Sequence, residues 1–155
     1  MKGKLITLSR SEAGRAAAAW RRRGLKVVFT NGVFDILHAG HVMLLRKARA
    51  LGDVLVLGLN TDASVRRLKG PSRPVNRWAD RAAVLTALEC VDAVVGFGED
   101  TPALLLSVLR PDVLVKGADY ALSEIAGSEH AARTVRIALK KGYSTTSLIR
   151  KLGTR

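Results

Sequence analysis

The side chains best suited to chemistry are two histidines, His38 and His41, which stand three positions apart after a short apolar run. The run Lys26-Val27-Val28-Phe29 is typical of a strand, and the residues from Val42 to Ala48 place apolar and basic side chains at helical spacing. The histidines therefore lie in a strand-loop-helix turn. In such a turn, free backbone N–H groups and the positive end of the helix dipole favour an anion. We expect it to bind phosphate, with the imidazoles as hydrogen-bond donors.

Two other interpretations of the histidine pair are a metal site and ordinary loop residues with satisfied hydrogen bonds. Metal-binding histidines on a helix usually stand four apart with a further ligand, and beyond this pair the chain offers only Cys90 and His130. Gly32 and Gly40 would let the backbone approach a ligand closely, whereas a structural turn needs only one of them. The sequence favours phosphate and predicts no metal site built from side chains.

The segment Gly32–His41 reads G-x-F-D-x-x-H-x-G-H. It resembles the signature of the nucleotidyltransferase superfamily that includes cytidylyltransferases, and is similar to the "HIGH" element of class I aminoacyl-tRNA synthetases. Further segments follow in the order found in D-glycero-β-D-manno-heptose 1-phosphate adenylyltransferases, including the adenylyltransferase half of bifunctional ADP-heptose synthases. These segments are Asn60-Thr61-Asp62, Arg67–Gly70, Arg73–Asn76, Val115–Tyr120, Glu124–Ser128 and Ser144-Thr145-Thr146. The resemblance runs from Ser9 to Leu152.

The resemblance implies an enzyme that transfers AMP from ATP to D-glycero-β-D-manno-heptose 1-phosphate, giving pyrophosphate and ADP-heptose for lipopolysaccharide or another surface glycan. Mg²⁺ is expected to accompany ATP, held mainly by phosphates and water. A kinase half is missing from the sequence, so we expect a separate heptose kinase. Two alternatives stay open, cytidylyl transfer to glycerol 3-phosphate and adenylyl transfer to flavin mononucleotide.

In such a transfer an oxygen of the acceptor attacks the α-phosphorus in line with departing pyrophosphate, so the protein has to position groups and neutralise charge. Backbone N–H groups of Gly32 and Phe34 would hold the α-phosphate, while His38 and His41 donate to oxygens whose charge grows. The resemblance implies that Lys69 also binds phosphate, from a loop rich in Gly and Pro that runs from Arg67 to Pro74 and is called the basic loop below. The alternative for Lys69 is a solvated basic loop. Further nucleotide contacts are expected from Asn31, Val33 and Gly40, and Asp35 is expected to hold the turn.

The resemblance places other nucleotide-binding residues at strand and helix ends. Asn60 and Asp62 end a strand where a nucleoside would lie, although Asp62 could instead cap a helix. The segment Ser144-Thr145-Thr146 is similar to an element that holds the β- and γ-phosphates, and it could also cap the last helix, with Arg150 assisting.

Four residues are assigned to the acceptor by resemblance. Asp119 would accept from sugar hydroxyls, and Lys116 lies in the same motif. Arg73 shares the basic loop and its alternative of plain solvation. Arg81 could face the ligand from a helix or form an exposed salt bridge there.

Apolar runs alternate with helical patterns, which predicts a single α/β domain with a doubly wound, Rossmann-like, parallel five-stranded sheet. Residues 1–24 are expected to form a lead-in helix of the same domain, and residues 25–155 the nucleotidyltransferase domain. Thr101 is predicted to cap a helix whose first turn contains Pro102. The expected strands are 26–30, 53–59, 91–96, 112–116 and 134–139, and the expected helices are 9–23, 40–51, 77–89, 101–109 and 145–152.

Composition fits this description. The chain has 155 residues and is 48% hydrophobic, enough for one core. It has no apolar run long enough to cross a membrane, and residues 1–5 lack a signal-peptide core, so we expect a cytoplasmic protein. The lone Cys90 is expected to be a small buried residue.

The net charge of +13 raises a different class of function, a basic nucleic-acid-binding module. The Lys and Arg residues are spread along the chain and aromatic residues make up only 5% of it, which disfavours nucleic acid as the main partner. A homodimer is expected from apolar residues on one helix, Trp78, Val84, Leu85 and Leu88. The alternative is that all of these pack on the sheet.

Overall fold

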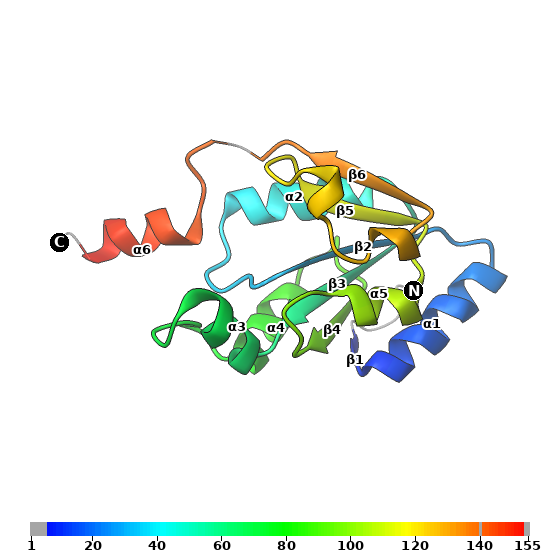
Figure 1. The fold of residues 1–155 in the computed structure, drawn as a ribbon, viewed down its shortest axis with the longest axis horizontal. Helices are drawn as coiled ribbons and strands as arrows, with labels where there is room; N and C mark the ends of the chain where they lie inside the picture. The colour runs from blue at the N-terminus through cyan, green and yellow to red at the C-terminus, as the bar shows by residue number, and fades with distance from the viewer. Residues whose placement is uncertain (1–5, 140, 154–155) are drawn as a thin grey trace.

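The structure, a computed structural model, describes residues 6–139 and 141–153 (Figure 1). Within these residues six parallel strands form one sheet in the order β1-β4-β3-β2-β5-β6. The strands are β1 (Ile6–Leu8), β2 (Val27–Gly32), β3 (Val54–Asn60), β4 (Ala93–Phe97), β5 (Val113–Gly117) and β6 (Arg133–Ile137). The helices are α1 (Arg10–Arg22), α2 (Ala39–Arg49), α3 (Asp62–Lys69), α4 (Trp78–Thr86), α5 (Ala103–Leu109) and α6 (Thr145–Gly153), with 3₁₀ turns η1 (Leu122–Glu124) and η2 (Ser128–His130).

Helices cover both faces of the sheet, which confirms the doubly wound α/β prediction. Along β2, Val27 and Phe29 pack into the apolar cluster that α1 and α5 complete. Val28, between them, packs into the opposite cluster with α2 and α4. Every residue of β3 is buried, as expected for an apolar run without alternation.

The chain reverses its direction of winding at β2. From β2 it passes to β3 and then outward to β4, and it afterwards crosses back to β5 on the other side of β2. Ligands of open parallel sheets bind in the crevice beyond the carboxyl ends of the strands at such a switch point. The carboxyl ends of β2 and β5 therefore frame the place for a site.

Three local predictions were wrong. The sheet has six strands among the described residues rather than five, because the three-residue β1 pairs with β4 at one edge. Helix α3 was absent from the expected helices, and only the alternative in which Asp62 caps a helix allowed for it. Helix α5 begins at Ala103 with Pro102 as its N-cap, since the Pro102 carbonyl accepts from Leu106 N–H at 2.9 Å. Thr101 thus lies one residue before the cap.

The apolar side chains of α4 serve mainly the core. Leu85 is buried, and Trp78 and Leu88 pack against the same cluster, while Val84 is 50% exposed. Most of the apolar side chains of α4 therefore pack on the sheet, as the alternative proposed. A homodimer stays a prediction. Cys90 is only partly buried, contrary to expectation.

Two elements, β6 and α6, lie at the periphery of the molecule. Strand β6 forms one edge of the described sheet and exposes Arg133 and Arg136. Helix α6 stands off the body of the molecule at its far end (Figure 1). No described helix is long and apolar enough to cross a membrane. Residues 1–5 of the expected lead-in segment lie outside the described residues.

Candidate active site

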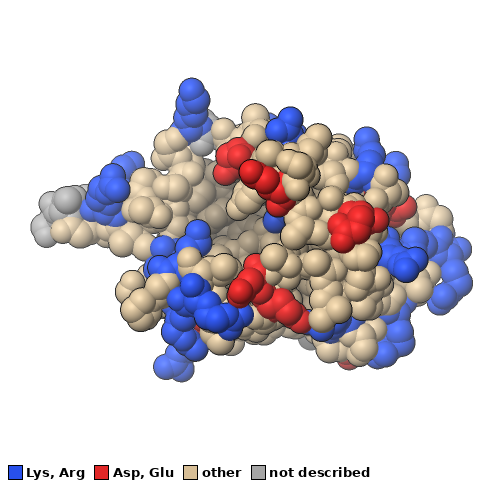
Figure 2. Space-filling view, in the orientation of Figure 1, with Lys and Arg blue, Asp and Glu red and all other residues tan. Residues whose placement is uncertain are grey.

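A cavity of about 590 Å³ opens at the carboxyl ends of the strands. Figure 2 shows the hollow in this face, with acidic side chains on both sides of it. Most of the predicted site residues line it, although they come from segments far apart in the sequence. Those lining it are Asn31, Gly32, Val33, Phe34, His38, Gly40, His41, Asn60, Lys69, Arg73, Lys116, Ser144, Thr145 and Thr146. Asp62, Arg81, Asp119 and Arg150 are not among the residues that line it.

The two histidines form a stacked pair at the start of α2. Their ring centroids are 3.7 Å apart and their planes differ by 21°. The Nδ1 atom of His38 accepts from the N–H groups of Gly40 and His41, at 3.1 and 3.4 Å, and His41 Nδ1 accepts from His38 N–H at 3.4 Å. Because both Nδ1 atoms act as acceptors, each neutral ring carries its hydrogen on Nε2. The pair can thus present two Nε2–H donors to a ligand.

Burial keeps the pair neutral. It lowers the pKa of His41 to about 4, with a further contribution from the charge of His38, and burial also lowers the pKa of His38. Before an anion binds, His41 is therefore an uncharged donor at neutral pH. Gly40 is required beside the pair, because a Cβ at this position would lie 2.9 Å from Tyr143 Cβ and 3.0 Å from the His38 ring.

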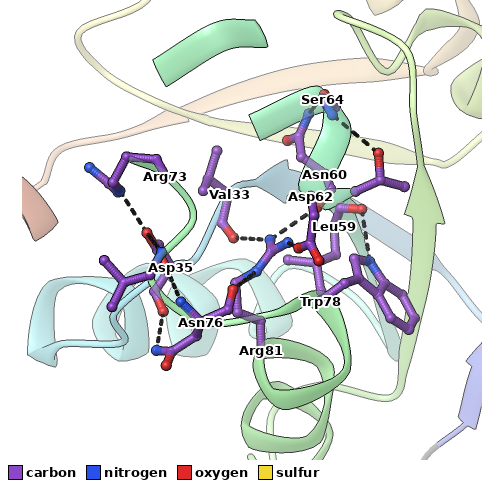
Figure 3. A network of polar contacts seen from close by, with 12 residues as sticks. Val33, Asp35, Leu59, Asn60, Asp62, Ser64, Arg73, Asn76, Trp78 and Arg81 are labelled. Carbon is purple, nitrogen blue, oxygen red and sulfur yellow. Dashed lines mark hydrogen bonds and ion pairs between the residues drawn. The ribbon is translucent and has the colours of Figure 1, made fainter. Parts of the chain in front are cut away.

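Asp35 ties the histidine motif to the basic loop. Its carboxylate is buried and accepts from Arg73 Nε at 2.6 Å and from the N–H groups of Val75 and Asn76 at 2.9 Å (Figure 3). Burial alone would raise the pKa of Asp35, but the hydrogen bonds from Asn76, Val75 and Arg73 bring it below its ordinary value. The prediction that Asp35 holds the turn is confirmed.

Lys69 and Arg73 were both expected in the basic loop, but the structure places Lys69 in the last turn of α3 and only Arg73 in the loop. Lys69 ends α3, is exposed and lines the cavity. The side chain of Arg73 is only 16% exposed because Asp35 holds it, so the alternative of a fully solvated residue is wrong for Arg73.

Lys116 brings a partly buried ammonium group to the cavity from β5. Its Nζ donates to Asn31 Oδ1 at 2.5 Å and lies 5.4 Å from the centroid of the Tyr120 ring. Burial lowers the pKa of Lys116 to about 8, and the charge of Asp119 partly opposes this. Asp119 itself is exposed beside the cavity. A phosphate at this position would stabilise the ammonium group that burial disfavours.

Arg81 is enclosed by protein acceptors. The residue is 2% exposed and donates to the carbonyls of Val33 at 2.7 Å and of Asn60 and Asn76 at 3.0 Å, and to Asp62 Oδ1 at 2.7 Å (Figure 3). The alternative of an exposed salt bridge is therefore wrong. The expectation of substrate contact is corrected as well, because the guanidinium lies behind the residues that line the cavity and is not itself one of the lining groups.

Asp62 does not cap a helix, and it is not among the residues that line the cavity. The N-cap of α3 is Thr61, whose Oγ1 accepts from Ser64 N–H at 3.4 Å, and the Asp62 carboxylate pairs with Arg81. Asn60 lines the cavity and donates through Nδ2 to Ser64 Oγ at 2.8 Å.

The start of α6 reaches the cavity from the other side. Ser144 Oγ accepts from Ser147 N–H at 3.0 Å, which confirms its capping role, and Ser144 also lines the cavity. Thr145 Oγ1 donates to the Ile36 carbonyl at 3.4 Å, which attaches the helix to the histidine loop. Arg150 is exposed further along α6.

Several lining residues were not predicted as site residues. Tyr120 and the run Glu124–Ala126 lie in segments that resemble the family, but the resemblance assigned no role to these residues. Asp100, Thr101 and Pro102 follow β4, and the rule that sites gather at strand ends could have found them. The other lining residues are Asp35, Leu44, Leu68, Leu139 and Tyr143.

Comparisons with known proteins agree with this geometry. A family model described as cytidylyltransferase-like matches residues 29–151. The bifunctional protein HldE of Mesorhizobium japonicum is 58% identical over 149 residues, and that of Caulobacter vibrioides is 52% identical over 154 residues, covering 94% and 97% of this chain. The chain spans 30% and 32% of the length of these two relatives. The crystal structure of the lipopolysaccharide core biosynthesis protein from Thermoplasma volcanium superposes with a TM-score of 0.65 and 30% identity, covering 76% of this chain and 100% of that one.

Proposed function

The chain belongs to the cytidylyltransferase-like family, and we propose that it transfers AMP from ATP to D-glycero-β-D-manno-heptose 1-phosphate, releasing pyrophosphate and ADP-heptose. The observation that carries this proposal is the stacked pair His38 and His41, which sits in one cavity with Lys69, Lys116 and the start of α6. The high identity to HldE proteins and the fold shared with a lipopolysaccharide core biosynthesis protein support the choice of acceptor.

The histidine motif would hold the reacting phosphorus. Backbone N–H groups of Gly32 and Phe34 bind the α-phosphate, and the Nε2–H donors of His38 and His41 bind oxygens that gain charge in the transition state. An oxygen of the acceptor phosphate forms the new bond to the α-phosphorus. The bond from that phosphorus to the departing pyrophosphate breaks, and no covalent enzyme intermediate is needed.

The remaining phosphates of ATP would lie between the start of α6 and the end of α3. Ser144, Thr145 and Thr146 supply hydroxyl and N–H donors at the start of α6. Lys69 approaches from α3 and neutralises charge on the leaving pyrophosphate.

The acceptor would occupy the side of the cavity nearest β5. Lys116 binds its phosphate, and Arg73 lines the same cavity. Asp119, exposed beside this side, is kept as a contact for sugar hydroxyls.

Mg²⁺ would enter with ATP, bound by phosphate oxygens and water. Asp35, the carboxylate of the histidine motif, already accepts hydrogen bonds from Arg73, Val75 and Asn76. Within residues 6–139 and 141–153, no group of three His, Cys, Asp or Glu side chains could hold a metal ion. Such an ion would supply positive charge that offsets the negative charge of the phosphates.

One assay separates the candidate reactions. ATP or CTP is offered with heptose 1-phosphate, glycerol 3-phosphate or flavin mononucleotide, and pyrophosphate release is measured with His41→Ala as the background control. We expect pyrophosphate from ATP with heptose 1-phosphate, and a product with the mass of ADP-heptose. Release only with CTP and glycerol 3-phosphate, or only with ATP and flavin mononucleotide, would replace this proposal with that reaction.

A further inference from the structure

The peptide unit between Val33 and Phe34 lies between the buried Arg81 and the cavity. Arg81 Nη1 donates to the Val33 carbonyl at 2.7 Å, and Val33 and Phe34 both line the cavity. Because this peptide bond is trans, its C=O and N–H point in opposite directions. A guanidinium that draws the carbonyl into the wall therefore turns the Phe34 N–H toward the cavity.

The conformation at Phe34 needs such support. Its φ is 46°, in the left-handed region that a residue with a side chain adopts only at an energetic cost. Within the described part of the chain no acceptor pairs with the Phe34 N–H. A backbone donor left open at a cavity is suited to an anionic ligand.

Arg81 holds this peptide from a fixed frame. Its guanidinium also donates to the Asn60 carbonyl at the end of β3 and to the Asn76 carbonyl after the basic loop. A further bond goes to the carboxylate of Asp62, the first residue of α3. One buried side chain thus sets the relative position of three segments that border the cavity (Figure 3). A lysine could keep the charge but could not make four bonds in these directions.

We propose that Arg81 is a positioning residue that orients the Val33–Phe34 peptide, so that the Phe34 N–H is already aimed at the α-phosphate before the nucleotide binds. The identity of that phosphate rests on the proposed function. Donors fixed in advance contribute most to the transition state, because the protein does not have to reorganise when charge develops. Arg81 therefore acts on turnover through the backbone without touching the substrate.

Arg81→Lys tests this inference, with Arg49→Lys as the matched control. Arg49 also pairs with a carboxylate, Asp92 at 3.0 Å, and donates to a carbonyl, Gly52 at 2.6 Å, but it lies outside the cavity lining. We expect kcat of Arg81→Lys to fall on the order of tenfold to hundredfold, with the KM for ATP within about threefold of wild type. Arg49→Lys should keep wild-type kcat.

A second readout follows backbone amide chemical shifts in ¹⁵N-labelled protein during titration with a non-hydrolysable ATP analogue. In wild type the Phe34 amide should respond strongly. In Arg81→Lys that response should shrink, while the amides of Gly40 and His41 respond as before. If Arg81→Lys does not fold, Asp62→Asn weakens the same guanidinium contact and should give the smaller change in the same direction.

A full Phe34 response in folded Arg81→Lys, or a kcat loss no larger than that of Arg49→Lys, would overturn the inference. A wild-type Phe34 amide that ignores the nucleotide would overturn it together with the proposed phosphate position. Turnover of a different acceptor with the Arg81 effect intact would overturn the acceptor in the proposed function and support this inference.

Discussion

Removing the partly buried charge of Lys116 should change how the stability of the protein depends on pH. Burial lowers the pKa of Lys116 from 10.5 to about 8 in the folded chain. Between these two values the unfolded chain holds a proton that the folded chain has released, so folding is favoured as pH rises. Below pH 8 both states are charged and the cost of burying the ammonium group is fully present.

The size of the effect follows from the pKa difference. At 1.36 kcal/mol per pKa unit, the shift corresponds to about 3 kcal/mol over the whole window and about 1 kcal/mol between pH 7 and pH 9. Lys116→Met lacks this term. The free energy of unfolding of wild type, measured against that of Lys116→Met, should therefore rise by these amounts as pH increases.

Urea unfolding of the two proteins at pH 7, 8, 9 and 10 measures the difference, with Lys47→Met, an exposed lysine on α2, as the control for losing one charge. A parallel assay follows kcat/KM for the acceptor, which should fall above pH 8 as the ammonium group loses its proton. Lys116→Arg, which stays charged, should remove that fall. A stability difference that is flat with pH, or that falls as pH rises, would refute the reasoning.

Four further outcomes are expected. His38→Ala and His41→Ala should each lose on the order of hundredfold in kcat with a smaller effect on ATP binding measured by calorimetry, and near-normal turnover would remove the pair from the mechanism. Lys69→Ala should raise the KM for ATP about tenfold. In a fluorescence titration, wild type should show no submicromolar, salt-sensitive binding of duplex DNA, and such binding would favour the nucleic-acid module. Asp35→Asn removes the charge that holds Arg73 and should lower the free energy of unfolding by about 2 kcal/mol, with a higher KM for the acceptor; unchanged chemical denaturation contradicts this. Light scattering across a concentration series should show a dimer, and a constant mass near 16.7 kDa would argue against it.

The sequence predicts the elements whose signal is local. Strand β3 is an uninterrupted apolar run, and the histidine motif carries its own turn and helix start, so both were placed within one or two residues. Strand β1 could not be found this way, because three residues acquire strand character only by pairing with β4. Helix α3 buries only Ser64 and Val65 in a charged segment, which gives no clear apolar face.

Site residues that belong to sequence motifs could be predicted. Contacts between side chains and backbone groups that are distant in the sequence could not. Lys116 and Ser144 were placed correctly at the cavity because strand and helix ends gather there. Arg81 was misjudged because charged residues are rarely fully buried, and its acceptors come from distant segments. No local pattern records those acceptors.

The edge strand β6 gives a physical role to part of the excess of Lys and Arg over Asp and Glu. An edge strand presents unpaired backbone N–H and C=O groups to which another chain can add. Arg133 and Arg136 stand exposed on this edge, so two copies that met there would bring four guanidinium groups together. The repulsion discourages edge-to-edge aggregation, and a second copy is expected to bind elsewhere on the molecule.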